Sequence, residues 1–116
     1  MSMNLEKLYQ HTLKWAEDRK ITVNGNSTTQ TLKLMSEMGE LADAIIKHDH
    51  EEIKDGIGDC LVVLSIIAKL EGLSLEECWE AAWNDIKDRK GILLKNGTFV
   101  KTTDSNYERL VKENQN

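Results

Sequence analysis

The sequence contains no proline, one phenylalanine and two cysteines among its 116 residues. With 40% hydrophobic and 30% charged residues, this composition fits a helical protein better than a disordered or β-rich one. Cys60 and Cys78 are isolated, each within an apolar helical pattern, which argues against a disulfide scaffold or a CxxC metal site. We therefore predict an all-α protein of one domain, with both cysteines as small core residues.

The sequence also lacks a long hydrophobic run and an excess of basic residues. The N-terminus MSMNLEKLYQ has no basic region followed by an apolar core, and the apolar run CLVVL is too short to cross a bilayer. A cytoplasmic protein without a membrane partner is therefore expected. The net charge of −5 disfavours binding to a nucleic acid polymer, although a nucleotide held through a metal ion remains compatible with it.

Hydrophobic periodicity predicts four helices. The first covers residues 4–19, and the second follows the loop ITVNGNSTT, starts with Ser27 or Thr28 as N-cap and ends near residue 48. The third covers residues 51–71, and Ser74 with Glu77 forms a capping box that opens a fourth helix ending near residue 90. The predicted apolar face of the second helix consists of Leu32, Met35, Met38, Leu41, Ala42 and Ile45.

The second half of the third helix, CLVVLSIIAKL, is apolar almost all round. A chain this small has few neighbours to cover such a helix, so we expect a homodimer or a homotetramer. After Gly91, Asn96-Gly97 between short apolar segments predicts a β-hairpin. Residues 1–90 are thus expected to form the helical part, and residues 91–116 the hairpin and tail of the same domain.

Acidic residues recur on one side of two consecutive helices. Glu37 and Glu40 lie about 60° apart and one turn apart in the second helix. Glu52, Asp55 and Asp59 line a stripe of the third helix. If the short joint between these helices makes them antiparallel, the carboxylates converge on a pocket that cations must neutralise. Oxygen ligands favour Mg²⁺, for which Mn²⁺ can substitute.

SEMGELADAI followed by KDGIGDCLVVLSIIA resembles the MazG-like, all-α nucleoside triphosphate pyrophosphohydrolases over residues 27–90. The resemblance implies a four-helix MazG-like bundle, here with a short C-terminal β-hairpin. It also implies that Glu-x-x-Glu and Glu-x-x-Asp motifs bind Mg²⁺ while a nucleoside triphosphate is split into monophosphate and pyrophosphate. Glu37 and Glu40 match the first motif, and Asp59 matches the last acid of the second.

The chain departs from the family pattern at two positions. Ser36 stands where the family often has an additional Glu, and Gly56 stands where the third metal-binding Glu would fall. Asp55 lies about 40° from Asp59 around the helix and is our preferred replacement. Glu52 is the second candidate, although it also suits the helix start as a charge favoured by the dipole.

The resemblance further implies that Asn84 and Lys87 contact the sugar and phosphate of the substrate. Lys33, one turn before Glu37, meets either a phosphate or only its neighbouring carboxylate. Trp15 is a candidate to stack on the base, although its place on an apolar helical stripe also suits a core residue.

These residues predict a Mg²⁺-dependent hydrolase acting on a (deoxy)nucleoside triphosphate, with no further cofactor. Glu37, Glu40 and Asp59, with Asp55, are expected to bind the metal, and one of Glu37 and Glu40 to orient the attacking water. The alternative is a non-catalytic helical module that mediates oligomerisation or regulation, or that senses a nucleotide without cleaving it. The missing acid at Gly56 is the main argument for that alternative.

Overall fold

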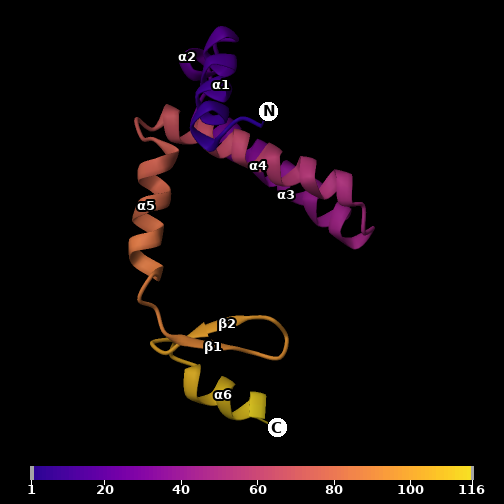
Figure 1. Ribbon diagram of the computed structural model, residues 1–116, viewed down its shortest axis with the longest axis vertical. Helices are drawn as coiled ribbons and strands as arrows, with labels where there is room; N and C mark the ends of the chain where they lie inside the picture. The colour runs from indigo at the N-terminus through magenta and orange to yellow at the C-terminus, as the bar shows by residue number, and fades with distance from the viewer. Residues whose placement is uncertain (1, 116) are drawn as a thin grey trace. The chain divides into compact units, whose positions relative to one another are not determined.

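The computed structural model describes residues 2–115, which fall into two compact units (Figure 1). The first unit ends at Cys78 and contains α1 (Leu5–Asp18), α2 (Ile21–Asn24), α3 (Ser27–Ile46) and α4 (His50–Leu70). The second begins at Trp79, within α5 (Leu75–Ile86), and contains β1 (Gly91–Leu93), β2 (Phe99–Lys101) and α6 (Tyr107–Gln115). The prediction of an all-α protein with a short C-terminal hairpin is confirmed.

Capping side chains fix where the helices begin. The side chain of Asn26 accepts a hydrogen bond from the backbone N–H of Thr29 at 2.8 Å, so the N-cap of α3 lies one residue before the earliest N-cap that we predicted. The predicted capping box of α5 is confirmed, because Ser74 and Glu77 exchange side-chain to backbone hydrogen bonds of 2.7 and 3.1 Å. The loop predicted between the first two helices contains the single turn α2, and α5 ends at Ile86 rather than near residue 90.

The joint between α3 and α4 reverses the chain over three residues. His48 adopts a left-handed conformation with φ of 55°, which lets the N–H of Asp49 reach the carbonyl of Ala44 at 3.0 Å. The side chain of Asp49 then accepts from the N–H of Glu52 at 3.2 Å and caps α4. The two long helices therefore lie antiparallel and side by side (Figure 1).

Of the predicted apolar face of α3, only Leu41 is among the covered positions, and Ala42 and Ile45 are exposed. Leu32, Met35 and Met38 are 63%, 62% and 51% exposed in the single chain. The covered positions are Leu34, Glu37, Leu41 and Ala44, which recur every three or four residues. The helix thus has two apolar faces, of which α4 covers the one that carries a carboxylate.

Gly56 lies at a close approach of α3 and α4. A Cβ atom at this position would lie 3.2 Å from Cβ and 3.3 Å from Cα of Leu41. Because the nearest atoms include backbone, they cannot move aside without shifting the helix. The glycine that departs from the family pattern thus lets the two helices approach closely.

The shorter helices of the first unit cover α4. Both α1 and α2 contact α4, and Ala16 of α1 has no exposed surface. The hydroxyl of Tyr9 accepts a hydrogen bond from the N–H of Leu75 at 3.2 Å and connects α1 to the start of α5. Even so, no large side chain within residues 2–115 is fully buried in the single chain.

The second unit contains the predicted hairpin. Ile92 pairs with Val100, and Gly97 has the positive φ of 90° that a glycine at this point of a hairpin loop supplies. The N–H of Lys95 donates to the side chain of Asn114 at 2.8 Å, which connects the hairpin loop to α6. The tail after the hairpin forms the nine-residue helix α6. None of the helices described has both the length and the hydrophobicity needed to cross a membrane.

The two glycines of α4 provide a matched test of this packing. A Cβ at Gly58 would meet nothing within 4 Å, so Gly58→Ala should stabilise the protein by about 0.5–1 kcal/mol through helix propensity. Gly56→Ala should lose this gain because Leu41 must move, leaving it at least ~1 kcal/mol less stable than Gly58→Ala. Urea denaturation followed by circular dichroism measures both, and equal gains would show that the helices do not approach closely at Gly56.

Candidate functional site

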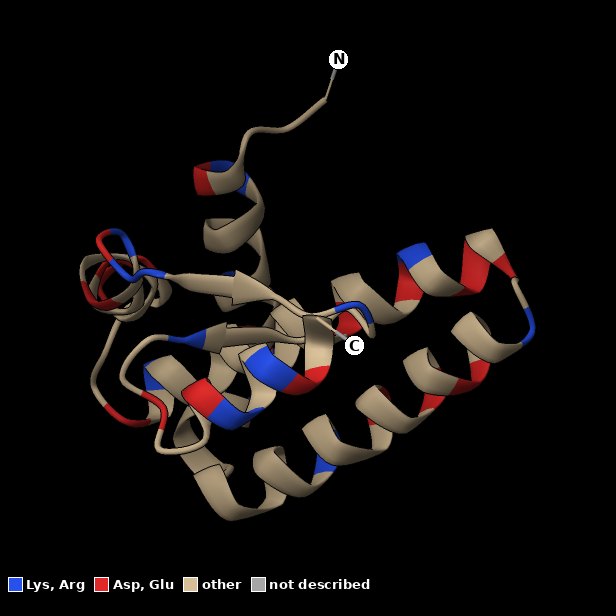
Figure 2. Cartoon of the chain, turned by 90° about the horizontal axis from the view of Figure 1, so that it is seen from below, with Lys and Arg blue, Asp and Glu red and all other residues tan. Residues whose placement is uncertain are grey.

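The α3–α4 pair brings four of the predicted site residues together. Lys33, Glu37 and Glu40 follow one another at steps of four and three residues on α3, and Asp59 lies on α4. The charges of Glu37, Glu40 and Asp59 all act on Lys33, so the four side chains form one electrostatic cluster. Figure 2 shows acidic positions recurring along both long helices. We refer to Glu37, Glu40 and Asp59 as the acidic cluster.

Glu37 is the buried member of the acidic cluster. Its side chain is 8% exposed, and its Oε1 accepts from the Lys33 ammonium at 3.0 Å. Its other oxygen, Oε2, is buried and has no hydrogen-bond partner among the residues described. A buried carboxylate oxygen is costly without a donor or a cation, so Glu37 is only partly satisfied.

The pKa values in the cluster move in opposite directions. The hydrogen bond from Lys33 lowers the pKa of Glu37 below its ordinary value. The negative charge of Glu37 raises the pKa of Glu40, and burial, followed by the charges of Asp55 and Glu37, raises that of Asp59. Lys33 therefore stabilises the charge of Glu37, and that charge in turn disfavours the ionised forms of Glu40 and Asp59.

The donor set of the cluster fits a hard divalent cation. Three carboxylates with an unpartnered buried oxygen among them match the oxygen ligands of Mg²⁺ or Mn²⁺. Within residues 2–115, however, no three His, Cys, Asp or Glu side chains are arranged closely enough to hold an ion as they stand. This agrees with carboxylates that repel one another while a lysine occupies the buried one.

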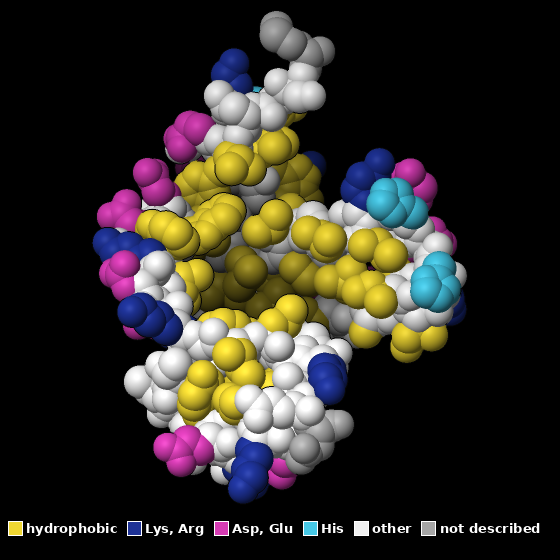
Figure 3. Space-filling view, turned by 60° about the horizontal axis from the view of Figure 1, so that its bottom comes forward, with side chains coloured by type: hydrophobic (Ala, Val, Ile, Leu, Met, Phe, Trp, Pro, Cys, Tyr) yellow, Lys and Arg dark blue, Asp and Glu magenta, His cyan; other side chains and the backbone are white. Residues whose placement is uncertain are grey.

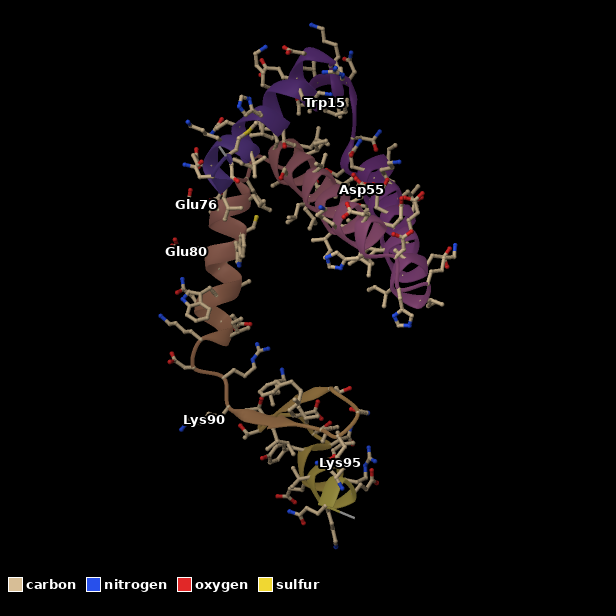
Figure 4. The ribbon with its side chains drawn as sticks, turned by 45° about the vertical axis from the view of Figure 1, so that its right-hand side comes forward. Trp15, Asp55, Glu76, Glu80, Lys90 and Lys95 are labelled. Atoms are coloured by element: carbon tan, nitrogen blue, oxygen red, sulfur yellow. The ribbon has the colours of Figure 1, made fainter. Side chains whose placement is uncertain are left out.

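The candidates for the missing acid lie on the exposed part of α4. Asp55 and Glu52 are both exposed, and Figure 4 labels Asp55 on the α4 ribbon. The charge of Asp55 acts on Asp59, the next acid of the stripe, whereas Gly56 is buried against Leu41. Asp55 therefore acts on the acidic cluster through its charge, whereas Gly56 allows α3 and α4 to pack closely.

The predicted substrate residues are distributed over both units. Lys33 belongs to the cluster itself. Trp15 lies on α1, is 45% exposed and carries the guanidinium of Arg19 at 4.5 Å from its ring centre, so the core alternative for Trp15 is wrong in the single chain (Figure 4). Asn84 lies in α5 and Lys87 just beyond its end, both exposed and both in the second unit.

The burial of Glu37 was not predicted from the sequence. The sequence nevertheless contains a pattern that indicates this burial, because Glu37 lies on one helical stripe with the apolar residues Leu34, Leu41 and Ala44. The more hydrophobic stripe on the other side of the same helix obscured this signal. An acidic residue on a stripe of covered residues indicates a site, because a buried carboxylate requires a hydrogen-bond donor or a cation beside it.

Residues 26–92 match the family model of the MazG nucleotide pyrophosphohydrolase domain. A protein of Haemophilus phage HP1, described as an uncharacterized 18.2 kDa protein in the rep-hol intergenic region, is 42% identical over 66 residues. That match covers 57% of this chain and 40% of the phage protein. No solved structure matches the chain significantly. The match to the family model contains α3, α4 and the acidic cluster.

Repulsion within the cluster should be measurable in the metal-free protein. Glu40→Gln removes the charge that Glu37 and Asp59 oppose, so it should raise the melting temperature in EDTA. Glu80→Gln makes the same change at an exposed position of α5 and should leave the melting temperature nearly unchanged. A lower melting temperature for Glu40→Gln would mean that Glu40 stabilises the metal-free fold instead of repelling its neighbours.

Proposed function

Because the chain belongs to the MazG nucleotide pyrophosphohydrolase family, we propose that it hydrolyses a (deoxy)nucleoside triphosphate to the monophosphate and pyrophosphate with Mg²⁺. The observation that carries the proposal is the buried Glu37 carboxylate, whose Oε2 has no partner in the described part of the chain. It lies in a cluster with more negative charge than Lys33 neutralises. The cytoplasm remains the expected compartment on the sequence argument alone.

In this proposal Glu37, Glu40 and Asp59 hold the ion. When bound, Mg²⁺ supplies charge neutralisation at the phosphates and lowers the pKa of a bound water, and Mn²⁺ can do the same. One of Glu37 and Glu40 accepts the proton of the attacking water and orients its oxygen toward the α-phosphorus. A new P–O bond forms there, the bridging bond to the β-phosphate breaks, and pyrophosphate leaves.

The remaining predicted residues position the substrate in this proposal. Lys33 contacts a phosphate, Asn84 and Lys87 contact the sugar and phosphate, and Trp15 stacks on the base. Asp55 supplies the carboxylate that the family places at position 56, supported by the action of its charge on Asp59. Glu52, one turn before Asp55 and nearer the start of α4, is the alternative donor.

Pyrophosphate release from a panel of nucleoside triphosphates tests the activity. We expect release with Mg²⁺ or Mn²⁺ and none in EDTA, and a loss of at least ~100-fold in kcat/KM for Glu37→Gln and Asp59→Asn. Asp55→Asn should lower turnover nearly as much as Asp59→Asn, and Glu52→Gln much less.

The variants also separate the possible outcomes. Full activity of Asp55→Asn together with loss in Glu52→Gln would assign the missing ligand to Glu52. Mg²⁺ should raise the melting temperature of the wild type, because it binds only the folded cluster, and Glu40→Gln should abolish most of this rise. A metal response without pyrophosphate release from any nucleotide would favour the non-catalytic or nucleotide-sensing module.

We further propose that the protein functions as a homodimer or a pair of dimers. Hydrophobic side chains remain uncovered on the face drawn in Figure 3. On α4, Ile57, Leu61 and Leu64 form an exposed stripe at helical spacing, and α3 exposes Met35 and Met38. Uncovered stripes on two adjacent helices favour a second copy of the same helical pair as their cover.

Sedimentation equilibrium at micromolar concentration tests this assembly. The wild type should sediment as a dimer or tetramer, and Met35→Glu should shift it toward monomer because it places a charge on the exposed stripe of α3. Gln10→Glu adds the same charge at an exposed polar position of α1 and should leave the assembly unchanged. A monodisperse wild-type monomer would contradict the proposal.

A further inference from the structure

The Lys33–Glu37 ion pair differs from the other helical ion pairs in its burial. Its lysine side chain is 58% exposed but its carboxylate only 8%. In the Lys14–Asp18 pair these values are 69% and 53%, and in the Lys54–Glu51 pair 71% and 78%. Exposed pairs of this kind contribute little, whereas a buried carboxylate depends on its counter-charge. Lys33 is thus the cation that makes the burial of Glu37 tolerable.

The contact leaves half of the carboxylate available. The ammonium of Lys33 lies 3.0 Å from Oε1 of Glu37, while the buried Oε2 has no partner in residues 2–115. The charges of Glu40 and Asp59 also act on Lys33, so its ammonium lies in the negative field of all three carboxylates. A divalent cation would be attracted by the same field to the same oxygens.

We propose that Lys33 is an internal counter-cation, which holds Glu37 in the metal-free protein and is displaced when Mg²⁺ binds. This inference rests on the proposed function and adds the regulation of its metal site. Mg²⁺ and the Lys33 ammonium compete for one buried carboxylate. Mg²⁺ displaces the ammonium because its two positive charges are attracted more strongly to the three carboxylates than the single charge of Lys33. No covalent bond is made or broken, and the Lys33 ammonium keeps its proton throughout.

The displaced lysine gains a second role. Its side chain is long, flexible and more than half exposed, so the ammonium can leave Oε1 without unfolding α3. It lies one turn from Glu37, within the reach of a phosphate that binds at the acidic cluster. Metal binding therefore frees one positive charge at the place where the triphosphate must be neutralised, which couples the ion to the substrate.

Isothermal titration with MgCl₂ alone tests the competition. Lys33→Met should bind Mg²⁺ about tenfold more tightly than the wild type, because the competing charge is gone. Lys54→Met is the matched control, since it removes the same charge from an exposed ion pair on α4 and should change the affinity less than about twofold. Lys33→Met should also melt at a lower temperature in EDTA, where Glu37 has lost its partner.

Displacement is distinguished from simple repulsion by the lysine ammonium itself. In a ¹H–¹⁵N spectrum of lysine side chains, the Lys33 signal, assigned by its absence in Lys33→Met, should shift or vanish on addition of Mg²⁺. The KM for the triphosphate should rise about tenfold or more in Lys33→Met while the metal affinity increases. Structural damage would instead weaken both, so opposite changes are the signature of the proposed exchange.

The outcomes separate this proposal from the function on which it rests. If Glu37→Gln abolishes Mg²⁺ binding but Lys33→Met binds no more tightly than the wild type, or the Lys33 signal is unchanged by Mg²⁺, the exchange is refuted and the metal site stands. If the wild type and Glu37→Gln bind Mg²⁺ equally or not at all, the metal site itself is refuted and the exchange with it.

Discussion

The burial of the Glu37 carboxylate between α3 and α4 is the constraint on which the rest of the site depends. An ionised carboxylate that is 8% exposed must be matched by a cation, and Lys33 supplies that cation from the preceding turn of the same helix. The match is incomplete, because Oε2 is left without a partner in the described chain and two further acids lie nearby. Among the residues described, the acidic cluster therefore carries more negative charge than Lys33 neutralises.

The backbone holds this unfavourable arrangement in place. Gly56 lets α4 approach Leu41 closely, and the reversal at His48 and Asp49 makes the two helices antiparallel. Asp59 is thereby brought to the Glu37 side of α3, where burial and neighbouring charges raise its pKa. Packing energy along the two helices offsets the electrostatic cost of holding these acids close together.

The apolar surface of α3 in the first unit is also only partly covered. In α3 one face packs against α4 and carries Glu37, while the opposite face exposes Leu32, Met35 and Met38. A helix with two apolar faces needs two neighbours, and α4 is one of them. The first unit thus combines the acidic cluster with exposed hydrophobic side chains on the same helical pair.

The sequence by itself determined the local features. Periodicity and capping residues predicted the four main helices within a few residues, Asn96-Gly97 predicted the hairpin, and acid spacing predicted one acidic stripe on each of the two long helices. These features depend on residues only a few positions apart in the chain, so the sequence alone contains the information that specifies them.

Only the tertiary structure decided which face of α3 is covered, that Glu37 is buried with Lys33, and that Gly56 serves the contact with Leu41. Each of these depends on which residues of another helix lie opposite. That choice is settled by the packing of α3 against α4 as a whole and not by the hydrophobicity of either helix alone.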